Sequence, residues 1–302
     1  MALTQWLLLI FLSVLWGGSF LFIGVAVQEL PTLTLVFARV GLAAVLLLPV
    51  IYAMGLRLPS RLTTWRDFAL MSLLNNVVPF LLIVRGQKEI ASGLASVLNA
   101  TTPLFAVILS HYFVAEGQAD LRRIAGVLIG MTGVAVLVGP EALFGQPASV
   151  FGMTCVLGAA ISYAISGLWG KRFRNIPLPV TAAGPLICST LFLLPLTLMI
   201  DRPWLLATPS TATIASVLAL ASLSTALAYV IFFRIMAVSG PTNTMLVTLL
   251  IPVSAIAFGT LVLNEVLLPR HIIGALVIAM ALLVLDGRVL NLFRRGTLTP
   301  PQ

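Results

Sequence analysis

The sequence predicts an all-α, polytopic membrane protein with ten transmembrane helices in two inverted five-helix repeats. Hydrophobic residues make up 60% of the 302 residues, charged residues make up only 9%, and the mean hydropathy is +1.12. A chain with so little polar surface cannot cover a soluble globule. Two further observations, a series of apolar runs and an internal repeat, give the number and the arrangement of the helices.

A helix needs about 20 apolar residues to cross the hydrocarbon core of a bilayer. Ten runs of this kind can be drawn, and they cover residues 4–27, 32–54, 66–86, 92–114, 121–139, 149–170, 179–200, 211–236, 241–263 and 270–287. No linker or change of composition marks a separate soluble domain. We therefore expect each run to form one span of a single membrane domain.

The internal repeat is visible in the spacing of prolines, carboxylates and glycines. Pro103 precedes Glu116 by 13 residues, and Pro252 precedes Glu265 by 13. The glycine that opens the next run also precedes the glycine that closes it by 13 residues in both places, at 126 and 139 and at 274 and 287. Apolar helices resemble one another by composition alone, but matched prolines followed by matched carboxylates favour a true repeat.

The repeat divides the chain into residues 1–145 and residues 146–302, the second half ending in a short basic tail. Because each half holds an odd number of spans, the second half must enter the membrane in the opposite sense. If the N-terminus is cytoplasmic, the inner turns and the tail carry 12 Lys and Arg residues and the outer turns carry 4. This bias places both ends of the chain in the cytoplasm, and it explains the net charge of +8 without a nucleic-acid partner.

Two prolines indicate where a binding site could lie. Pro103 and Pro252 fall about midway along the fourth and ninth runs, where each would leave the carbonyl four residues before it, that of Asn99 or Thr248, without its helical donor. Backbone groups freed at membrane depth must find another partner, and paired breaks in inverted halves are the best pointer to a transport site. The alternative is a pair of kinks that only shape the bundle.

Uncharged polar and aromatic residues also fall within the runs. They are Asn75, Asn76, Asn99, Ser162, Tyr163, Ser166, Trp169, Ser224, Thr225 and Tyr229. Each could serve only as a hydrogen-bonding contact between helices. As a set they predict a cavity with aromatic walls, which suits a zwitterionic or amphipathic solute better than an inorganic ion.

Charged residues are rare inside the runs. Arg39 is the one guanidinium clearly within a run, where it could hold a substrate carboxylate or could extend to water at the nearer membrane surface. All nine carboxylates lie in turns or near helix ends, which favours facilitated transport or exchange over obligate proton antiport. His111 and Glu116 remain the alternative proton sites.

The sequence contains no signature of catalysis or of metal binding. HExxH, GxSxG and paired aspartates at membrane depth are absent, so we expect no enzyme and no catalytic residue. Cys155 and Cys188 both lie in apolar runs and indicate neither a disulfide nor a zinc site. No metal or cofactor is therefore expected.

Several motifs together resemble a known family. Leu15-Trp16-Gly17-Gly18-Ser19-Phe20, Pro31 followed by Phe37-Ala38-Arg39, and the repeated proline-to-glutamate pattern look like the EamA family of the drug/metabolite transporter superfamily, most of all its aromatic amino-acid exporters. The resemblance implies ten helices in two inverted halves around a cavity lined mainly by helices one, three, four, six, eight and nine. It also implies export of metabolites such as amino acids across a bacterial inner membrane by a multi-pass protein. The halves are not identical, because Tyr163 stands roughly where Trp16 stands in the first half and no arginine in the seventh run matches Arg39.

On this resemblance, we expect substrate to contact residues from both halves. The candidates are Trp16, Ser19, Arg39, Asn75, Asn76, Pro79, Asn99, Pro103, Tyr163, Trp169, Tyr229 and Pro252. Glu116 and Glu265 are assigned to helix ends as capping or gating residues. The predicted protein is a monomer that exports aromatic and other neutral amino acids by alternating access. A drug, lipid or other metabolite exporter, with or without proton coupling, remains open, whereas a nucleotide-sugar carrier would require more basic residues than Arg39.

Overall fold

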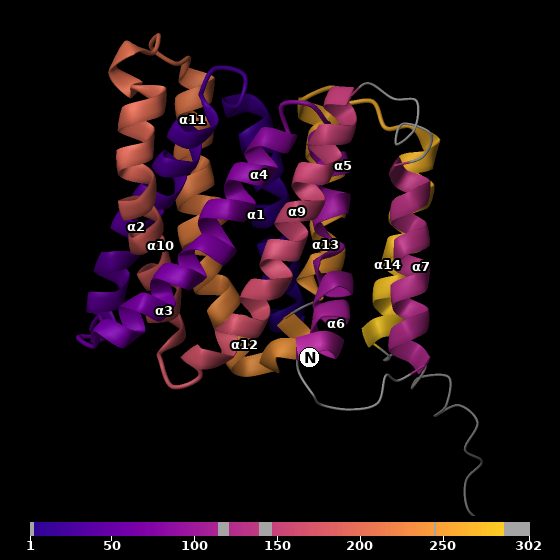
Figure 1. Cartoon of the computed structure of the whole chain (residues 1–302), viewed down its shortest axis with the longest axis horizontal. Helices are drawn as coiled ribbons and strands as arrows, with labels where there is room; N and C mark the ends of the chain where they lie inside the picture. Colours follow the sequence, from indigo (N-terminus) through magenta and orange to yellow (C-terminus); the bar gives the residue numbers. More distant parts are fainter. Residues whose placement is uncertain (1–2, 114–120, 139–146, 245, 287–302) are drawn as a thin grey trace, which may run out of the picture.

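The computed structural model describes residues 3–113, 121–138, 147–244 and 246–286. Every regular element in these ranges is helical, as the sequence predicts (Figure 1). Seven helical stretches are long and apolar enough to cross a membrane, and shorter apolar helices occupy Ile124–Val136, Val247–Val262 and Pro269–Val284. Together these stretches coincide with the ten predicted spans.

The first half contains five spans. They are α1 (Leu3–Ala26), α2 (Thr32–Ala53), a third span made of α3 (Leu62–Ser72), η1 (Leu73–Val77) and α4 (Val78–Gly86), a fourth made of α5 (Ser92–Asn99) and α6 (Thr102–Phe113), and α7 (Leu121–Val138). The second half repeats this plan. Its elements are α9 (Pro147–Trp169) with η2 (Gly170–Phe173), α10 (Leu178–Leu196) with η3 (Thr197–Asp201) and η4 (Pro203–Leu205), α11 (Thr211–Ala221) with η5 (Ser222–Leu227) and α12 (Ala228–Thr244), α13 (Val247–Val262) and α14 (Pro269–Asp286).

The two halves run in opposite directions through the bundle. In Figure 1, α1 starts at the end marked N and leads to the turn at Val27–Leu30 at the opposite end, whereas α9 leads back to the turn at residues 170–177 near the N mark. We call these two ends the N face and the far face. The predicted division between residues 145 and 146 lies outside the described residues.

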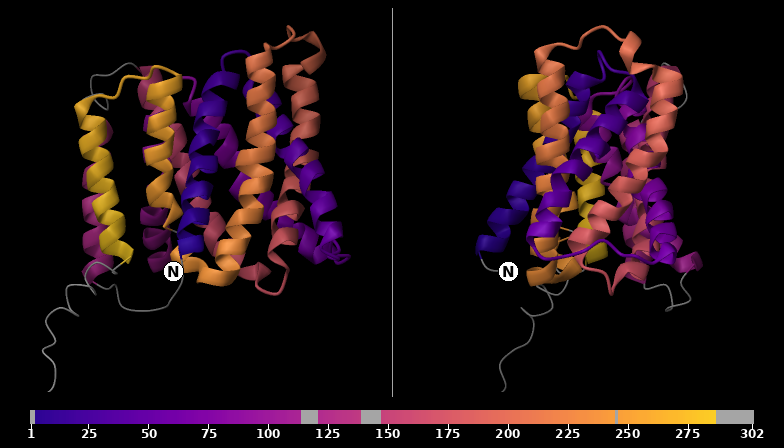
Figure 2. Two further views of the ribbon diagram at one scale, coloured as in Figure 1. Left: turned by 180° about the vertical axis from the view of Figure 1, so that it is seen from behind. Right: turned by 90° about the vertical axis from the view of Figure 1, so that its left-hand side faces the viewer.

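Helix packing follows the same inverted symmetry. The second span of one half packs on that of the other (α2 on α10), and the two fifth spans, α7 and α14, pack along each other. The contact of α1 with α13 has its counterpart in the contact of α9 with α6. Figure 2 shows α7 and α14 side by side at one end of the bundle. The halves are therefore interleaved across a common interface, which is where an inverted-repeat carrier would hold its substrate.

The predicted proline breaks are only partly correct. Helix α5 ends at Asn99 and α6 begins at Thr102, so Pro103 lies in the first turn of a new helix, where its missing N–H leaves no helical bond unmade. The Asn99 carbonyl is not free, because it accepts a 2.7 Å hydrogen bond from the Thr102 hydroxyl. Pro252 lies inside α13, which begins five residues before it, and Thr248 also has an interaction partner. The break in the fourth span therefore comes before Pro103, and Pro252 lies inside a continuous helix.

Candidate functional site

Two wide helical turns stand at corresponding places in the two halves. The third span is interrupted by the π-helical η1 and the eighth span by the π-helical η5. Single π turns inside α-helices are rare and occur frequently at functional sites. Pro79, which follows η1 at the second residue of α4, offers a sequence signal for the first turn because it cannot donate a helical bond. The turn at η5 has no such signal, and the sequence analysis missed both.

Arg39 projects from α2 towards η5. Its Nε donates a 3.1 Å hydrogen bond to Thr225 Oγ1, and the same hydroxyl donates to the Leu220 carbonyl at 2.8 Å. The guanidinium carbon lies 3.7 Å from the centroid of the Phe80 ring, a cation–π contact. Only 6% of Arg39 is exposed, so the expectation that it could extend to water at the membrane surface is wrong.

The charge of Arg39 is not balanced within the described part of the chain. Among these residues, ion pairs join Arg85 to Glu89 and Arg172 to Asp67, and neither includes Arg39. A charged side chain inside a membrane protein normally faces the bundle interior or a wet cavity and finds a partner there. The guanidinium can therefore bind an anionic group of a solute.

Two tyrosines lie near this guanidinium. Tyr163 of α9 and Tyr229 of α12 are close enough to Arg39 to interact with it electrostatically. The Asn75 side chain lies near Tyr229, and its Oδ1 accepts a 3.0 Å hydrogen bond from the Ser166 hydroxyl. Asn75, on η1, is therefore bonded to α9 and lies beside α12.

The neighbouring asparagine extends the chain of hydrogen bonds to α10. Asn75 Nδ2 donates to Asn76 Oδ1 at 3.2 Å, and Asn76 Nδ2 donates to the Ser189 hydroxyl at 3.1 Å. Asn76 is 1% exposed, and both ends of its amide are bonded within the protein. We use the term central network for the set Arg39, Asn75, Asn76, Tyr163, Ser166, Ser189, Thr225 and Tyr229.

An aromatic row leads from the central network to the first helix. Tyr229 stacks on Phe233 with centroids 6.0 Å apart, Phe233 meets Phe232 edge to face at 5.5 Å, and Phe232 contacts Trp16 at 5.4 Å. Three of these rings belong to α12 and one to α1. Trp16 and Tyr229, predicted separately, are thus the two ends of one row, and the sequence analysis missed Phe232 and Phe233 between them.

The remaining candidates lie apart from this network or have structural partners. The Ser19 hydroxyl donates to the Trp16 carbonyl within α1 at 2.5 Å. Trp169 lies one turn beyond Ser166 on α9, and the Arg172 guanidinium covers its ring at 3.9 Å. Asn99 Oδ1, Trp169 Nε1 and Ser224 Oγ are buried atoms without a hydrogen-bond partner. The described residues include no cluster of His, Cys, Asp or Glu that could hold a metal. Glu116 and the side chain of His111 lie outside the described residues.

A cavity of about 540 Å³ opens at the far face, where four connections meet. Its walls include Gln28, Glu29, Gln87, Ser210 and Glu265. Gln87 Nε2 donates to the Phe20 carbonyl and to the Ser92 hydroxyl, both at 2.9 Å. The Glu29 carboxylate accepts bonds from the Ser210 hydroxyl at 2.6 Å and from the Ser210 N–H at 2.7 Å, and these bonds lower the pKa of Glu29 below its ordinary value.

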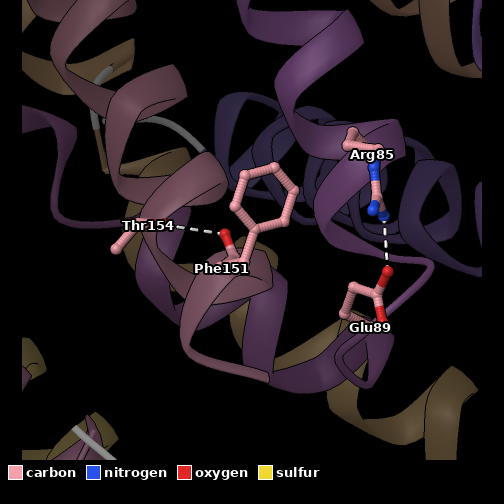
Figure 3. A network of polar contacts seen from close by, with 4 residues as sticks. All are labelled: Arg85, Glu89, Phe151 and Thr154. Carbon is pink, nitrogen blue, oxygen red and sulfur yellow. Dashed lines mark hydrogen bonds and ion pairs between the residues drawn. The ribbon is translucent and has the colours of Figure 1, made fainter. Parts of the chain in front are cut away.

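Beside this cavity, α4 meets the start of α9. Arg85 and Glu89 form an ion pair at 2.6 Å, and the Arg85 guanidinium carbon lies 4.9 Å from the centroid of the Phe151 ring (Figure 3). Thr154 donates to the Phe151 carbonyl at 2.8 Å and so completes this corner of the far face. Arg85 and Glu89 are four residues apart, so their ion pair is local to one segment of the first half.

An inverted, interleaved helical bundle with a buried polar network between its halves defines a polytopic membrane protein of the carrier type. The sequence pattern of the EamA-like transporter family matches residues 4–139 and again residues 150–285. The chain belongs to this family of membrane transporters, as the resemblance of its motifs predicts.

Individual relatives support the same class. The uncharacterized transporter YoaV of Bacillus subtilis is 26% identical over 275 residues, which cover 89% of this chain and 92% of that protein. The uncharacterized inner membrane transporter YedA of Escherichia coli K12 is 31% identical over 172 residues, covering 56% of this chain and 53% of that protein. A solved structure described only as a crystal structure of protein shares the fold, with a TM-score of 0.67 at 18% identity over 92% of this chain and 96% of its own.

Proposed function

We propose that the protein exports aromatic and other neutral amino acids by alternating access, through facilitated diffusion or exchange. The observation that carries this proposal is the buried Arg39, which forms no ion pair among the described residues and lies beside two tyrosines. A guanidinium recognises a carboxylate through parallel hydrogen bonds. The aromatic row from Tyr229 to Trp16 offers apolar surface for the substrate side chain.

The proposed site draws on both halves, as alternating access requires. Arg39 and Asn75 belong to the first half, and Tyr163 and Tyr229 to the second. Arg39 binds the substrate carboxylate, and Asn75 and the tyrosine hydroxyls supply uncharged hydrogen-bonding groups. Asn99, whose Oδ1 has no partner, accepts from the substrate ammonium group. The other candidates are proposed as lining: Trp16, Ser19, Asn76, Pro79, Pro103, Trp169 and Pro252.

The proposed setting is a bacterial inner membrane, with both chain ends in the cytoplasm and the protein acting as a monomer. The name of the relative YedA and the excess of basic residues in one set of turns support this setting. Cysteines introduced at the exposed Gln28 on the far face and at the exposed Arg57 on the N face would test the orientation. An impermeant maleimide added to intact cells should label only the first.

The function itself is tested with purified protein in liposomes loaded with unlabelled phenylalanine. Uptake of labelled phenylalanine, tryptophan, threonine or methionine is followed without any ion gradient. We expect saturable uptake that internal substrate accelerates. Phenethylamine, which lacks the carboxylate, should inhibit this uptake with an affinity at least about tenfold lower than that of phenylalanine. This is the difference expected from the loss of one charge-assisted hydrogen bond.

The Arg39→Gln variant connects this result to the site. It should lose the discrimination between phenylalanine and phenethylamine, whereas the matched variant Ser222→Ala should keep it, because the half-buried Ser222 hydroxyl bonds only the Leu218 carbonyl. Uptake that requires a pH gradient would overturn the facilitated mechanism. Transport of phenethylamine but not of any amino acid would favour a drug exporter with the same fold.

A further inference from the structure

The repeated proline-to-glutamate motif has one carboxylate in the described part of the chain, and the proposed substrate site does not use it. Glu265 lies just beyond the end of α13, at the far face. The local backbone is shaped to bring its side chain back towards the bundle. Asn264 takes a left-handed conformation with φ 54°, and the Glu265 N–H donates to the Gly259 carbonyl at 3.0 Å. A Cβ at Gly259 would meet the Glu265 carboxylate, so a larger residue there would displace this side chain.

The carboxylate of Glu265 binds the other half of the protein. Its Oε1 accepts a 2.7 Å hydrogen bond from the Ser92 N–H, and its Oε2 accepts a 3.1 Å bond from the Gly93 N–H. Both groups belong to the first turn of α5, where the N–H groups have no helical partner and the helix dipole favours a negative charge. One side chain of the second half therefore caps a helix of the first half.

Two other far-face carboxylates make the same kind of contact. Asp201, at the end of η3, accepts from the N–H and the hydroxyl of Thr34 in the first turn of α2, at 2.7 and 2.8 Å. Glu29 binds Ser210, the N-cap of α11. All three contacts cross between the halves, and all three lie on the far face. Their combined effect is to hold the halves together at this end of the bundle.

Helix α5 is a short, buried, capped element that is interrupted at both ends. It has 8 residues, it follows a turn at Gln87–Ala91, and it ends at the break before Thr102. Its far-face end borders the 540 Å³ cavity through Ser92, and its other end carries Asn99, which is a proposed substrate ligand. Because neither end of α5 continues directly into another helix, α5 can tilt as a unit once the hydrogen bonds to its first turn are broken.

We propose that Glu265 is the latch of a far-face gate. While its carboxylate holds the first turn of α5, the path between the far-face cavity and the interior is closed. When water replaces these two hydrogen bonds, α5 tilts and the path between the far-face cavity and the interior opens. The latch does not depend on the identity of the substrate, although its part in the transport cycle rests on the function proposed above.

The test measures access from the far face to the interior end of α5. In a Cys155→Ala, Cys188→Ala background, Asn99→Cys places one thiol at that end, and its rate of reaction with an impermeant maleimide added only at the far face is followed in sealed vesicles of known orientation. Glu265→Gln should accelerate labelling by about tenfold, because a neutral amide holds the two N–H groups less strongly. Gly259→Ala, which displaces the carboxylate without changing its charge, should act in the same direction. Glu265→Asp should lie between the parent and Glu265→Gln.

The matched control is Glu89→Gln. Glu89 also lines the cavity, but its partner Arg85 belongs to its own segment, so this variant should label at the parent rate. The proposal is overturned if Glu265→Gln and Gly259→Ala label like the parent, if Glu89→Gln labels as fast as Glu265→Gln, or if both variants unfold, since Glu265 would then be only a structural cap. If the wild type moves no amino acid but the latch variants open the path, the proposed substrate fails and the latch stands.

Discussion

Arg39 is held by a hydroxyl on one side and an aromatic ring on the other. Thr225 accepts from Nε, so it fixes the plane in which the remaining N–H groups of the guanidinium point, while Phe80 faces the cation without competing for hydrogen bonds. This leaves the positive charge in place and leaves donors for a ligand. Orientation by Thr225 and binding by Arg39 are therefore separable.

Thr225→Val tests this separation at the residue scale. The substitution keeps the shape of the side chain but removes the acceptor, so the guanidinium can rotate and the bidentate geometry is lost. We expect KM for phenylalanine to rise about tenfold, equivalent to about 1.4 kcal/mol, with kcat within about twofold. Ser222→Ala, which removes a half-buried hydroxyl of the same turn that bonds only the Leu218 carbonyl, should change neither constant. A fall in kcat with unchanged KM would contradict the positioning role.

Glu29 provides a pH-dependent contact at the far face. Hydrogen bonds from the Ser210 hydroxyl and N–H lower its pKa below 4.5, so its contribution to stability is fully present above the unfolded-state pKa and is lost as the pH falls through the lowered folded-state value. Thermal melting of the purified protein between pH 7 and pH 3 should show part of the acid destabilisation. Ser210→Ala should reduce that part, because it removes the strongest donor. An unchanged pH profile in Ser210→Ala would contradict this assignment.

At the scale of elements, the π turns η1 and η5 inside the third and eighth spans are not evident in the sequence. A π turn closes its hydrogen bond over five residues instead of four, so it adds one residue to the turn while the hydropathy remains that of an ordinary span. The residues Asn75, Asn76 and Tyr229 could be found because polar groups and rings are unusual in apolar runs. Thr225 was indicated in the same way, but not its contact with Arg39, and Phe80 was not indicated at all, because both contacts join residues far apart in the sequence.

Deletion of Leu223 tests the role of η5. Removing one residue from a π turn restores α-helical spacing while the flanking helices keep their register, so ΔLeu223 should fold with a melting temperature within about 5 °C of the wild type. It should lose transport, because Thr225 no longer reaches Arg39. The matched deletion, ΔLeu218, removes another exposed leucine from the regular helix α11 and should be strongly destabilised. Equal stability of the two deletions would contradict the π-turn account.

For the whole molecule, the inverted repeat could be predicted because matched prolines, carboxylates and glycines recur at equal spacing in halves with an odd number of spans. The interleaving of the halves could not, because it depends on surfaces that meet only after folding. The Asp201 and Thr34 contact joins residues 167 positions apart, and Glu265 and Ser92 are 173 apart. From the sequence alone, each of these carboxylates is only a charged residue near the end of a helix.

The pairing of α7 with α14 is the clearest test of how the halves are joined. Gly133 of α7 faces Ile278 and the Gly274 carbonyl of α14, and a Cβ added at Gly133 would lie 2.8 Å from the Ile278 side chain and 3.1 Å from that carbonyl. Small residues at such seams let helix backbones approach closely in a membrane. Gly133→Val must push the two helices apart, so it should lower the free energy of unfolding by about 1–3 kcal/mol. Gly167→Val, at an exposed glycine with nothing within 4 Å, should have almost no effect. Thermal melting in detergent compares the two, and equal melting temperatures would mean that α7 and α14 are not packed against each other in the membrane.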